Sequence, residues 1–285
     1  MKFIFANFTN LLRQFKTSAL LNILGLSVAF AVFIVIAIQT YNDATFNHGF
    51  SKVDTIEYLE LTYTDGNKVK HMSYFLGEQI DSIIPEIKSF CVYGVWGNRP
   101  FNKSLEDRTK YDVPTRYTSK GFLEIFTPEI IKGSTVGLFE DSNLALISEK
   151  TAQKIFGDED PIGKNLYNHY NTDNFVTIAA VYKDFPENST VENGLYGKEY
   201  SRDPSEWSFM LFFDIVPGTR EAIIAKLNKE DSWNEGILRW KDENADNKRQ
   251  LSILPMKDMF MDAPGNKASF LLCCFSNFSN TFSFH

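Results

Sequence analysis

The stretch GDEDPIGKNL, residues 157–166, carries the pattern in this sequence that most resembles a chemical site. Gly157 and the pair Gly163-Lys164 resemble a phosphate-binding loop, in which backbone N–H groups, a lysine and a hydroxyl hold the phosphate. The spacing here is one residue too long, and Asn165 stands where the hydroxyl should be. Three consecutive acids between the glycines would repel a polyanion. The sequence therefore argues against a nucleotide site.

The elements around this loop also differ from those of a phosphate-binding loop. Such a loop follows a strand and opens a helix, whereas this one follows the helical pattern SEKTAQKIFG and leads into strand-like sequence. Ser148 suits the N-cap of that helix, because its hydroxyl can accept a hydrogen bond from a free backbone N–H. Gly157 suits the C-cap. No G-x-S-x-G motif surrounds Ser148, so the sequence does not indicate a nucleophile there.

Other residue types that bind metals or catalyse reactions show no useful spacing. The acids Asp158, Glu159 and Asp160 point in different directions within one loop, and we expect a solvated turn. The histidines lack the spacing of metal ligands; they are His48, His71, His169 and His285. The sequence therefore predicts no catalytic residues, no metal and no cofactor.

Cysteines and tryptophans give structural expectations only. Three cysteines, at 91, 273 and 274, are too few for a disulfide framework, and we expect Cys91 to be buried in an apolar strand. The tryptophans are interpreted either as exposed anchors for a partner or as packing residues; they are Trp96, Trp207, Trp233 and Trp240.

Charge is distributed unevenly along the 285 residues. Residues 1–40 contain Lys2, Arg13 and Lys16 and no acid, so they carry +3, whereas the remainder carries −10 within a net charge of −7. A chain this acidic is not expected to bind nucleic acid. Leu20–Thr40 has no charged residue and would span about 31 Å as a helix, which matches the hydrocarbon core of a bilayer. The sequence therefore predicts a transmembrane helix at 20–40.

The three cations before this helix place the N-terminus in the cytoplasm and the acidic remainder outside. Two other interpretations are a cleaved signal peptide, which usually has a shorter apolar stretch, and a buried core helix, which usually has a polar stripe. Residues 1–19 fit a short amphipathic helix on the cytoplasmic surface, or the start of one long transmembrane helix.

Beyond Tyr41, alternating residues flank Asp65-Gly66 and predict a β-hairpin. A helical pattern follows and should end at Pro85, where the ring of proline interrupts it, and the next run, SFCVYGVW, reads as a buried strand. A second hairpin is predicted around NTDN, and strand and helix patterns return from Ser208. The fold class is therefore α+β, with a middle region inserted into a sheet that the two ends form.

Four motifs in this order resemble the MacB/FtsX-type permeases of ABC transporters, over about residues 5–263. The first motif resembles the first transmembrane helix of these permeases and its exit into the periplasm; it is LNILGLSVAFAVFIVIAIQTYNDATFNHGFSKVDTIEYLE. The other three motifs are LISEKTAQKIFGDEDPIGKNL, VTIAAVYKDFPENST and LSILPMKDMFM. The resemblance implies that the residues of these motifs shape turns and caps and do no chemistry; they are Ser148, Gly157, Pro161, Gly163, Lys164, Asp184, Pro186 and Pro255.

The resemblance also implies a domain organisation. A cytoplasmic segment (1–19) and the transmembrane helix (20–40) would precede a periplasmic core (41–263). Within that core, a porter-like α/β subdomain, about 45–100 and 208–262, would carry a small inserted α/β subdomain at about 101–207. Residues 264–285 would form a tail in place of a second transmembrane helix, because ASFLLCCF is too short to span a bilayer.

The function that the resemblance implies is that of a non-catalytic permease subunit in the bacterial inner membrane, here as a C-terminally truncated fragment or as a genuine short product. Its periplasmic domain would couple ATP hydrolysis by a cytoplasmic ATPase to substrate export or to force transmission across the envelope. Expected partners are that ATPase, a second permease copy and a periplasmic protein, although the region that grips the ATPase is missing. The alternative is a single-anchor binding or sensor module that acts without an ATPase.

Overall fold

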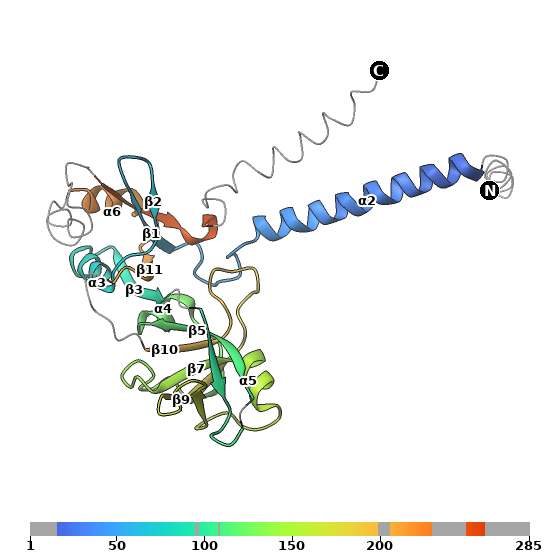
Figure 1. Ribbon diagram of the computed structural model, residues 1–285. Coiled ribbons are helices and arrows are strands. Elements are labelled where there is room, and N and C mark those ends of the chain that lie inside the picture. Colours follow the sequence, from blue (N-terminus) through green and yellow to red (C-terminus); the bar gives the residue numbers. More distant parts are fainter. Residues whose placement is uncertain (1–15, 95–96, 108, 199–205, 230–248, 260–285) are drawn as a thin grey trace. The chain divides into compact units, whose positions relative to one another are not determined.

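The computed structural model describes residues 16–94, 97–107, 109–198, 206–229 and 249–259 (Figure 1). The predicted amphipathic segment before Lys16 and the predicted tail after residue 263 lie outside these residues. The chain forms two compact units, residues 1–45 and 46–285, and each is described by itself.

The first unit is the helix α2, Lys16–Ala44, which extends beyond both ends of the predicted transmembrane segment. It is the one helix within the described residues that is long and apolar enough to cross a membrane, and none of its apolar stretch is buried. The hydroxyls of Ser27 and Thr40 donate to the carbonyls of Ile23 and Ile36 at 2.7 and 2.8 Å. These groups are thus satisfied inside the helix, as an apolar surrounding requires.

Four antiparallel strands form one end of the second unit, in the order β3-β11-β1-β12. They are β1 (Ile56–Thr62), β3 (Ile87–Gly94), β11 (Phe209–Ile215) and β12 (Gln250–Pro255). The helix α3 (Tyr74–Ile83) follows β1 along the chain and precedes β3, and α6 (Arg220–Leu227) connects β11 to β12. This is the strand order of a split β-α-β unit. The two ends of the outer region thus share one sheet, as the sequence predicts.

Local signals explain these elements. β1 turns at Gly66, with φ of 85°, into the short strand β2 (Lys68–Val69), which confirms the first predicted hairpin. Ser73 caps α3 by accepting a hydrogen bond from the backbone N–H of Leu76 at 3.3 Å, and the helix ends before Pro85. Both helices pack on one face of the four strands, where Leu59, Phe213 and the helix residues Ile80 and Ile223 share a core.

A ring of six strands forms the other end of this unit, in the order β10-β7-β9-β8-β4-β5. Pairing of β5 with β10 closes the ring. The β7–β9 and β5–β10 pairs are parallel and the other four are antiparallel, so the sheet is mixed and barrel-like. The strands are β4 (Asn98–Asn102), β5 (Tyr111–Thr118), β7 (Leu144–Ser148), β8 (Asn165–Asn168), β9 (Phe175–Tyr182) and β10 (Leu195–Lys198).

Shorter elements complete the ring. The helix α4 (Gly121–Phe126) follows β5, and α5 (Glu149–Phe156) follows β7. The strand β6 (Ile130–Gly133) pairs with β9 outside the closed path, and a 3-10 turn, Met256–Asp258, follows β12. The second predicted hairpin, β8–β9, is confirmed.

One residue pair, Tyr93 with Thr118, joins the four strands to the ring through β3 and β5. The α+β class is confirmed. The strands of the ring all lie between residues 98 and 198, in the region predicted to be inserted, but they close into a barrel-like sheet that the sequence patterns did not indicate. The division into two named subdomains remains a prediction.

Candidate functional site

Asn47, three residues after the end of α2 along the chain, ties three distant segments together. It is fully buried, and its backbone adopts a left-handed φ of 62°. Its N–H donates to the carbonyl of Asn188 at 2.9 Å. Its amide nitrogen Nδ2 donates to the hydroxyl of Thr190 at 3.0 Å and to the carbonyl of Met256 at 2.8 Å, and its Oδ1 accepts from the N–H of Thr190 at 2.7 Å. We call residues 46–50, 184–194 and 255–259 the Asn47 junction.

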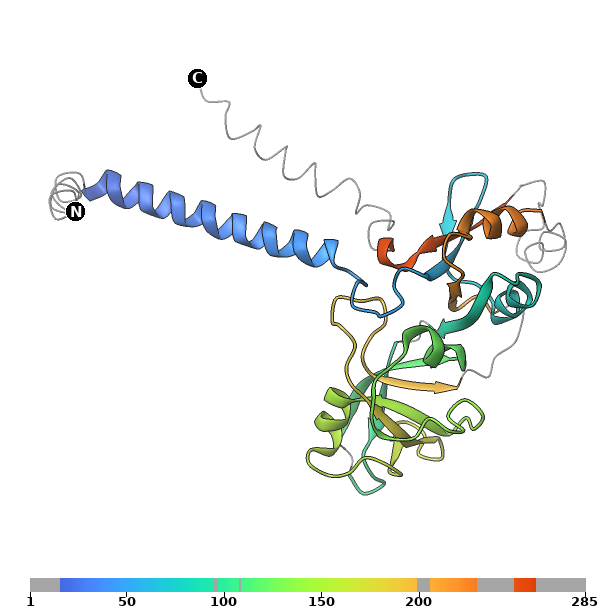
Figure 2. The ribbon, with the colours of Figure 1, turned by 180° about the vertical axis from the view of Figure 1, so that it is seen from behind.

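Close packing supports these hydrogen bonds. A Cβ on Gly49 would lie 2.2 Å from Cγ of Pro186, so the residue that faces this proline must be glycine. The ring of Phe50 packs against Phe126 and Phe185, with centroids 5.5 and 5.4 Å apart. Figure 2 shows the loop after β9 reaching from the ring to the segment that starts this unit. The three segments are therefore held as one body.

The helix α5 begins beside the junction. Ser148 is its N-cap: the Ser148 hydroxyl accepts a hydrogen bond from the N–H of Thr151 at 3.3 Å. The carboxylate of Asp184 accepts from the backbone N–H of Lys150 at 3.2 Å, and the ammonium of Lys150 pairs with Glu187 at 2.6 Å. A carboxylate at this end of a helix is favourable, because the N-terminal N–H groups carry partial positive charge.

The loop that leads back into β10 is closed on itself. Asn193 accepts from the N–H of Phe185 at 2.7 Å and donates to its carbonyl at 2.8 Å. Gly194 donates to the hydroxyl of Tyr182 at 3.0 Å, and its carbonyl accepts from the N–H of Ser148 at 2.8 Å. Most polar groups at this mouth of the ring thus have partners within the chain, whereas the buried Oδ1 of Asp184 has none among the described residues.

The predicted motif residues fall into two groups. Ser148, Asp184, Pro186 and Pro255 come from three motifs and lie in or beside the junction, and the first motif contributes Asn47 itself. The second group lies beyond the other end of α5 and comprises Gly157, Pro161, Gly163 and Lys164.

The loop 157–164 is charged, and its acids Asp158 and Glu159 line a pocket of about 370 Å³, where their negative charges disfavour phosphate. Gly157 and Gly163 have φ of 61° and 77°, which favours glycine. Hydrogen bonds from Lys103 and then Lys164 lower the pKa of Glu159 to about 2. Asp160 pairs with Lys132 at 2.9 Å, which also lowers the pKa of Asp160. The two lysines nearest Glu159 are thus engaged within the chain. The role of these residues as shapers of the loop remains a prediction.

Two buried carboxylates of the four-stranded sheet near the junction are paired with cations. Glu57 accepts from Nε of Arg220 at 3.0 Å, and Asp214 pairs with Lys52 at 3.1 Å. Burial raises the pKa of Glu57, and the hydrogen bond from Arg220 opposes that rise. Breaking such a buried pair from one side leaves a charge without its partner, which is strongly destabilising.

The cysteine and histidine side chains that the structure describes are buried or make contacts within the chain. Burial raises the pKa of the Cys91 thiol well above its usual range, which keeps it protonated. His48 contacts the carbonyl of Phe46 at 2.9 Å, and His169 contacts Oδ1 of Asn102 at 2.7 Å. Within the described residues, no group of His, Cys, Asp or Glu side chains could hold a metal ion. Trp207 packs against the core of the four strands; the other tryptophans lie outside the described residues.

Asn47 and Thr190 are the main residues that sequence reasoning missed. Both lie inside quoted motifs, in FNHGF and ENST. Asn is one of the few residues that adopt a left-handed backbone readily, so the Asn before His-Gly was a usable signal for a turn. Its hydrogen-bond partners lie 143 and 209 residues away in the sequence, so the residues next to Asn47 do not indicate them.

The family model described as MacB-like periplasmic core domain matches residues 19–235. A domain of a protein designated a permease, from Porphyromonas gingivalis, has a TM-score of 0.59 at 22% identity and covers 72% of this chain and 92% of that chain. The periplasmic region of MacB from Actinobacillus actinomycetemcomitans gives 0.49 at 12% identity, with 76% and 97% covered.

The extracellular domain of the ABC-type transporter YknZ from Gram-positive bacteria gives a TM-score of 0.47 at 13% identity, with 69% of this chain and 99% of that chain covered. Comparison with the curated proteins yields no match. The likeness to the Porphyromonas domain shows a shared fold. The family model covers well over half of the chain, and the chain therefore belongs to the family of the MacB-like periplasmic core domain.

Proposed function

We propose that the chain is a permease subunit of a MacB-type ABC transporter in the inner membrane of a bacterium. Its periplasmic core couples ATP hydrolysis by a cytoplasmic partner to substrate export or to force transmission across the envelope. The expected partners are an ABC ATPase, a second permease copy and a periplasmic protein. The core does no covalent chemistry in this role.

The Asn47 junction is the observation that carries the coupling role. α2 ends at Ala44, and three residues later the chain is bound to both the end of β12 and the loop between β9 and β10. A displacement of the chain at Asn47 would therefore reach the four-stranded sheet and the ring together. Well-packed cores respond to such displacements as whole bodies, because they deform little.

The sheet topology supports the proposed domain organisation. Strands from 56–94 and 209–255 form the four-stranded end, which we assign to the porter-like subdomain, and strands from 98–198 form the ring, which we assign to the inserted one. With Lys16 at its start and acidic sequence after it, α2 would place its N-terminus in the cytoplasm and the core outside.

Sidedness is tested with single cysteines in the full chain, after replacement of Cys273 and Cys274 by serine. Val136→Cys places a thiol on a side chain that is 86% exposed in the segment between β6 and β7, and Thr17→Cys places one at the start of α2. A membrane-impermeant maleimide should label the first in spheroplasts and the second only after lysis. The reverse pattern would overturn the periplasmic assignment.

Coupling is tested on the tagged full chain extracted from its own membranes. We expect an ABC ATPase to copurify, and hydrogen exchange at residues 46–50 and 184–194 to change when ATP with vanadate is added. Exchange at the core strand β11 serves as the internal control and should not change. If no ATPase copurifies and the junction does not respond, the single-anchor binding module becomes the better account.

A further inference from the structure

A pocket of about 360 Å³ opens at the mouth of the ring opposite the Asn47 junction. β7 enters the ring here, after Asn143, and leaves at Ser148 beside the junction. The pocket is lined from the starts of β4 and β9, the ends of β5 and β8, and the segment before β7. Its volume falls within the roughly 300–1,000 Å³ of ligand pockets, and barrel mouths are a common place for them.

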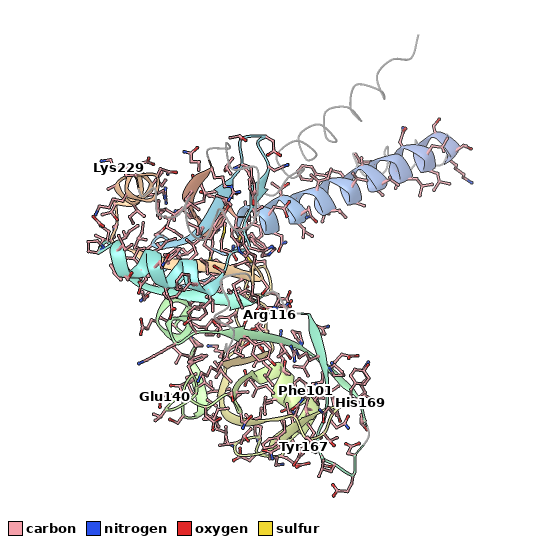
Figure 3. The ribbon with its side chains drawn as sticks, turned by 60° about the vertical axis from the view of Figure 1, so that its left-hand side comes forward. Phe101, Arg116, Glu140, Tyr167, His169 and Lys229 are labelled. Carbon is pink, nitrogen blue, oxygen red and sulfur yellow. The ribbon has the colours of Figure 1, made fainter. Side chains whose placement is uncertain are left out.

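Both aromatic rings and carboxamides line this pocket. Phe101 and Tyr117 line it from β4 and β5, and Phe175, with 37% of its surface exposed, lines it from β9. The guanidinium of Arg99 lies 4.9 Å from the ring centroid of Tyr117. Figure 3 shows Phe101, Tyr167 and His169 gathered at this end, where β4 pairs with β8.

Several polar side chains of the pocket are unengaged. The side chains of Asn143, Asp173 and Asn174 and the guanidinium of Arg99 make no hydrogen bond or ion pair to any residue in the part of the chain that the structure describes. Asn168 differs, because its Oδ1 accepts from two backbone N–H groups of the following turn, at 2.9 and 3.1 Å. Each free carboxamide offers both donors and an acceptor.

The balance of charge defines the ligand further. Arg99 and Asp173 are the charged residues among those that line the pocket, and their charges cancel, so a strongly anionic or cationic ligand gains little. The ring strands pair on both sides around the closed path, which leaves no free edge there for an added peptide strand. What remains is a neutral ligand with many hydroxyls and one apolar face.

We propose that this pocket binds a neutral saccharide. The C–H face of a sugar ring would lie on Phe175, because the face of an aromatic ring is electron-rich and attracts polarised C–H groups. The hydroxyls would pair with the carboxamides of Asn143 and Asn174, which both donate and accept, and with the guanidinium of Arg99, which donates. The site goes beyond the proposed coupling role, since saccharide binding at this mouth requires neither an ATPase nor movement of the junction.

The test uses the full chain in phosphatidylcholine nanodiscs, because sugar-based detergents would compete for the pocket. Cellobiose, maltose and N,N′-diacetylchitobiose are titrated separately by saturation-transfer NMR and calorimetry. We expect at least one to bind with a dissociation constant of about 1 mM or below, or about −4 kcal/mol.

Variants locate the binding. Phe175→Ala and Asn143→Ala should each weaken it tenfold or more. The matched control is Tyr170→Ala, an aromatic on the same β8–β9 hairpin that is 78% exposed and outside the pocket lining, and it should bind as the parent chain does. Because Phe175 also packs near Tyr167, at 5.9 Å between ring centroids, the exposed Asn143 keeps the test decisive if Phe175→Ala fails to fold.

Three results would overturn the proposal. One is that none of the three saccharides binds. Another is that binding is equal in the parent, Phe175→Ala and Asn143→Ala. The third is that a neutral peptide binds at this mouth with the same dependence on Phe175 and Asn143 while the saccharides do not. None of these results bears on sidedness or on ATP-dependent exchange, so the two proposals fail separately.

Discussion

At the mouth of the ring that leads into the Asn47 junction, most polar groups are at least half-buried and paired: Asn193 makes two hydrogen bonds to Phe185, and Gly194 bonds to Tyr182 and Ser148. At the opposite mouth, Asn143 and Asn174 are exposed and their side chains have no partner among the described residues. The same six strands thus close one mouth and leave the other open.

The difference separates a structural role at the closed mouth from a ligand-binding role at the open mouth. A buried polar group without a partner costs about 1–3 kcal/mol, so a buried network persists only where nearly every member is satisfied and the geometry is fixed. Exposed carboxamides are satisfied by water and impose no such condition, and a ligand can replace that water. Substitutions should therefore change stability at the closed mouth and ligand binding at the open one.

Asn47→Ala should have the largest effect. It removes the side-chain bonds to Thr190 and Met256 and puts alanine at a φ of 62°. Lost partners and backbone strain together should lower the free energy of unfolding by about 3 kcal/mol. Urea unfolding of the full chain, followed by intrinsic fluorescence, measures it.

Asn47→Gly is the matched control, because glycine adopts this φ without strain but makes none of the lost hydrogen bonds. Its free energy of unfolding should be about 1 kcal/mol higher than that of Asn47→Ala. A loss below about 1 kcal/mol in Asn47→Ala would mean that the junction does not hold the three segments together.

Gly194→Ala should be next in size. Its Cβ would lie 2.1 Å from the carbonyl oxygen of Pro114, a backbone atom that cannot rotate away. Overpacking of this kind typically costs about 1–3 kcal/mol, and we expect the upper part of that range. Gly97→Ala, just before β4 and with no atom near its added Cβ, should leave the unfolding midpoint unchanged. If the two substitutions shifted the unfolding midpoint equally, the closed and open mouths would not differ in how tightly they are packed.

The two ends of β7 allow a smaller and sharper comparison. Ser148→Ala removes the N-cap of α5 and should cost about 1 kcal/mol. Asn143→Ala, directly before the same strand, should cost nothing measurable because its side chain is exposed and has no hydrogen-bond partner among the described residues. Thermal unfolding of both variants at one pH measures the difference. A stability loss in Asn143→Ala as large as that in Ser148→Ala would show that the open mouth is also a structural network.

The smallest effect should come from Glu159, which is exposed yet paired with Lys103 and Lys164. Its pKa falls from an ordinary 4.5 to about 2. A carboxylate with a lowered folded pKa adds stability above its unfolded pKa, and this contribution disappears as the pH falls through about 2. Carbon-13 NMR titration of the carboxyl group reports the pKa. Glu159→Gln should flatten only this part of the stability profile, and an ordinary pKa near 4.5 would show that the pairs do not persist in solution.

Local signals in the sequence predicted much of the fold. The Asp65-Gly66 hairpin, the end of α3 before Pro85 and the helix that Ser148 caps all follow from neighbouring residues. The closed ring does not follow from neighbouring residues, because β5 and β10 pair in parallel across about 80 residues and β10 has only four residues. Strands that short show no usable alternation, and ring closure is a property of distant pairs.

The site was predictable only in part. The motifs marked Ser148, Asp184 and Pro186 as structural, but their meeting with Asn47 depends on a fold that brings the ends of the chain together. The pocket at the open mouth was missed because the loop NHYNTDNF reads as an ordinary hairpin turn. Its aromatic and amide residues gain significance only beside Arg99 and Tyr117 from other strands.

Gly94 and Phe209 lie directly opposite each other at the ends of β3 and β11. The chain between them, which contains the whole ring, thus leaves and re-enters the sheet at neighbouring positions, much as a hairpin loop does. A two-residue turn could join those strands without moving either one. The ring is thus an insertion between two paired strands, and its length and sequence can vary without a change in the register of β3 with β11.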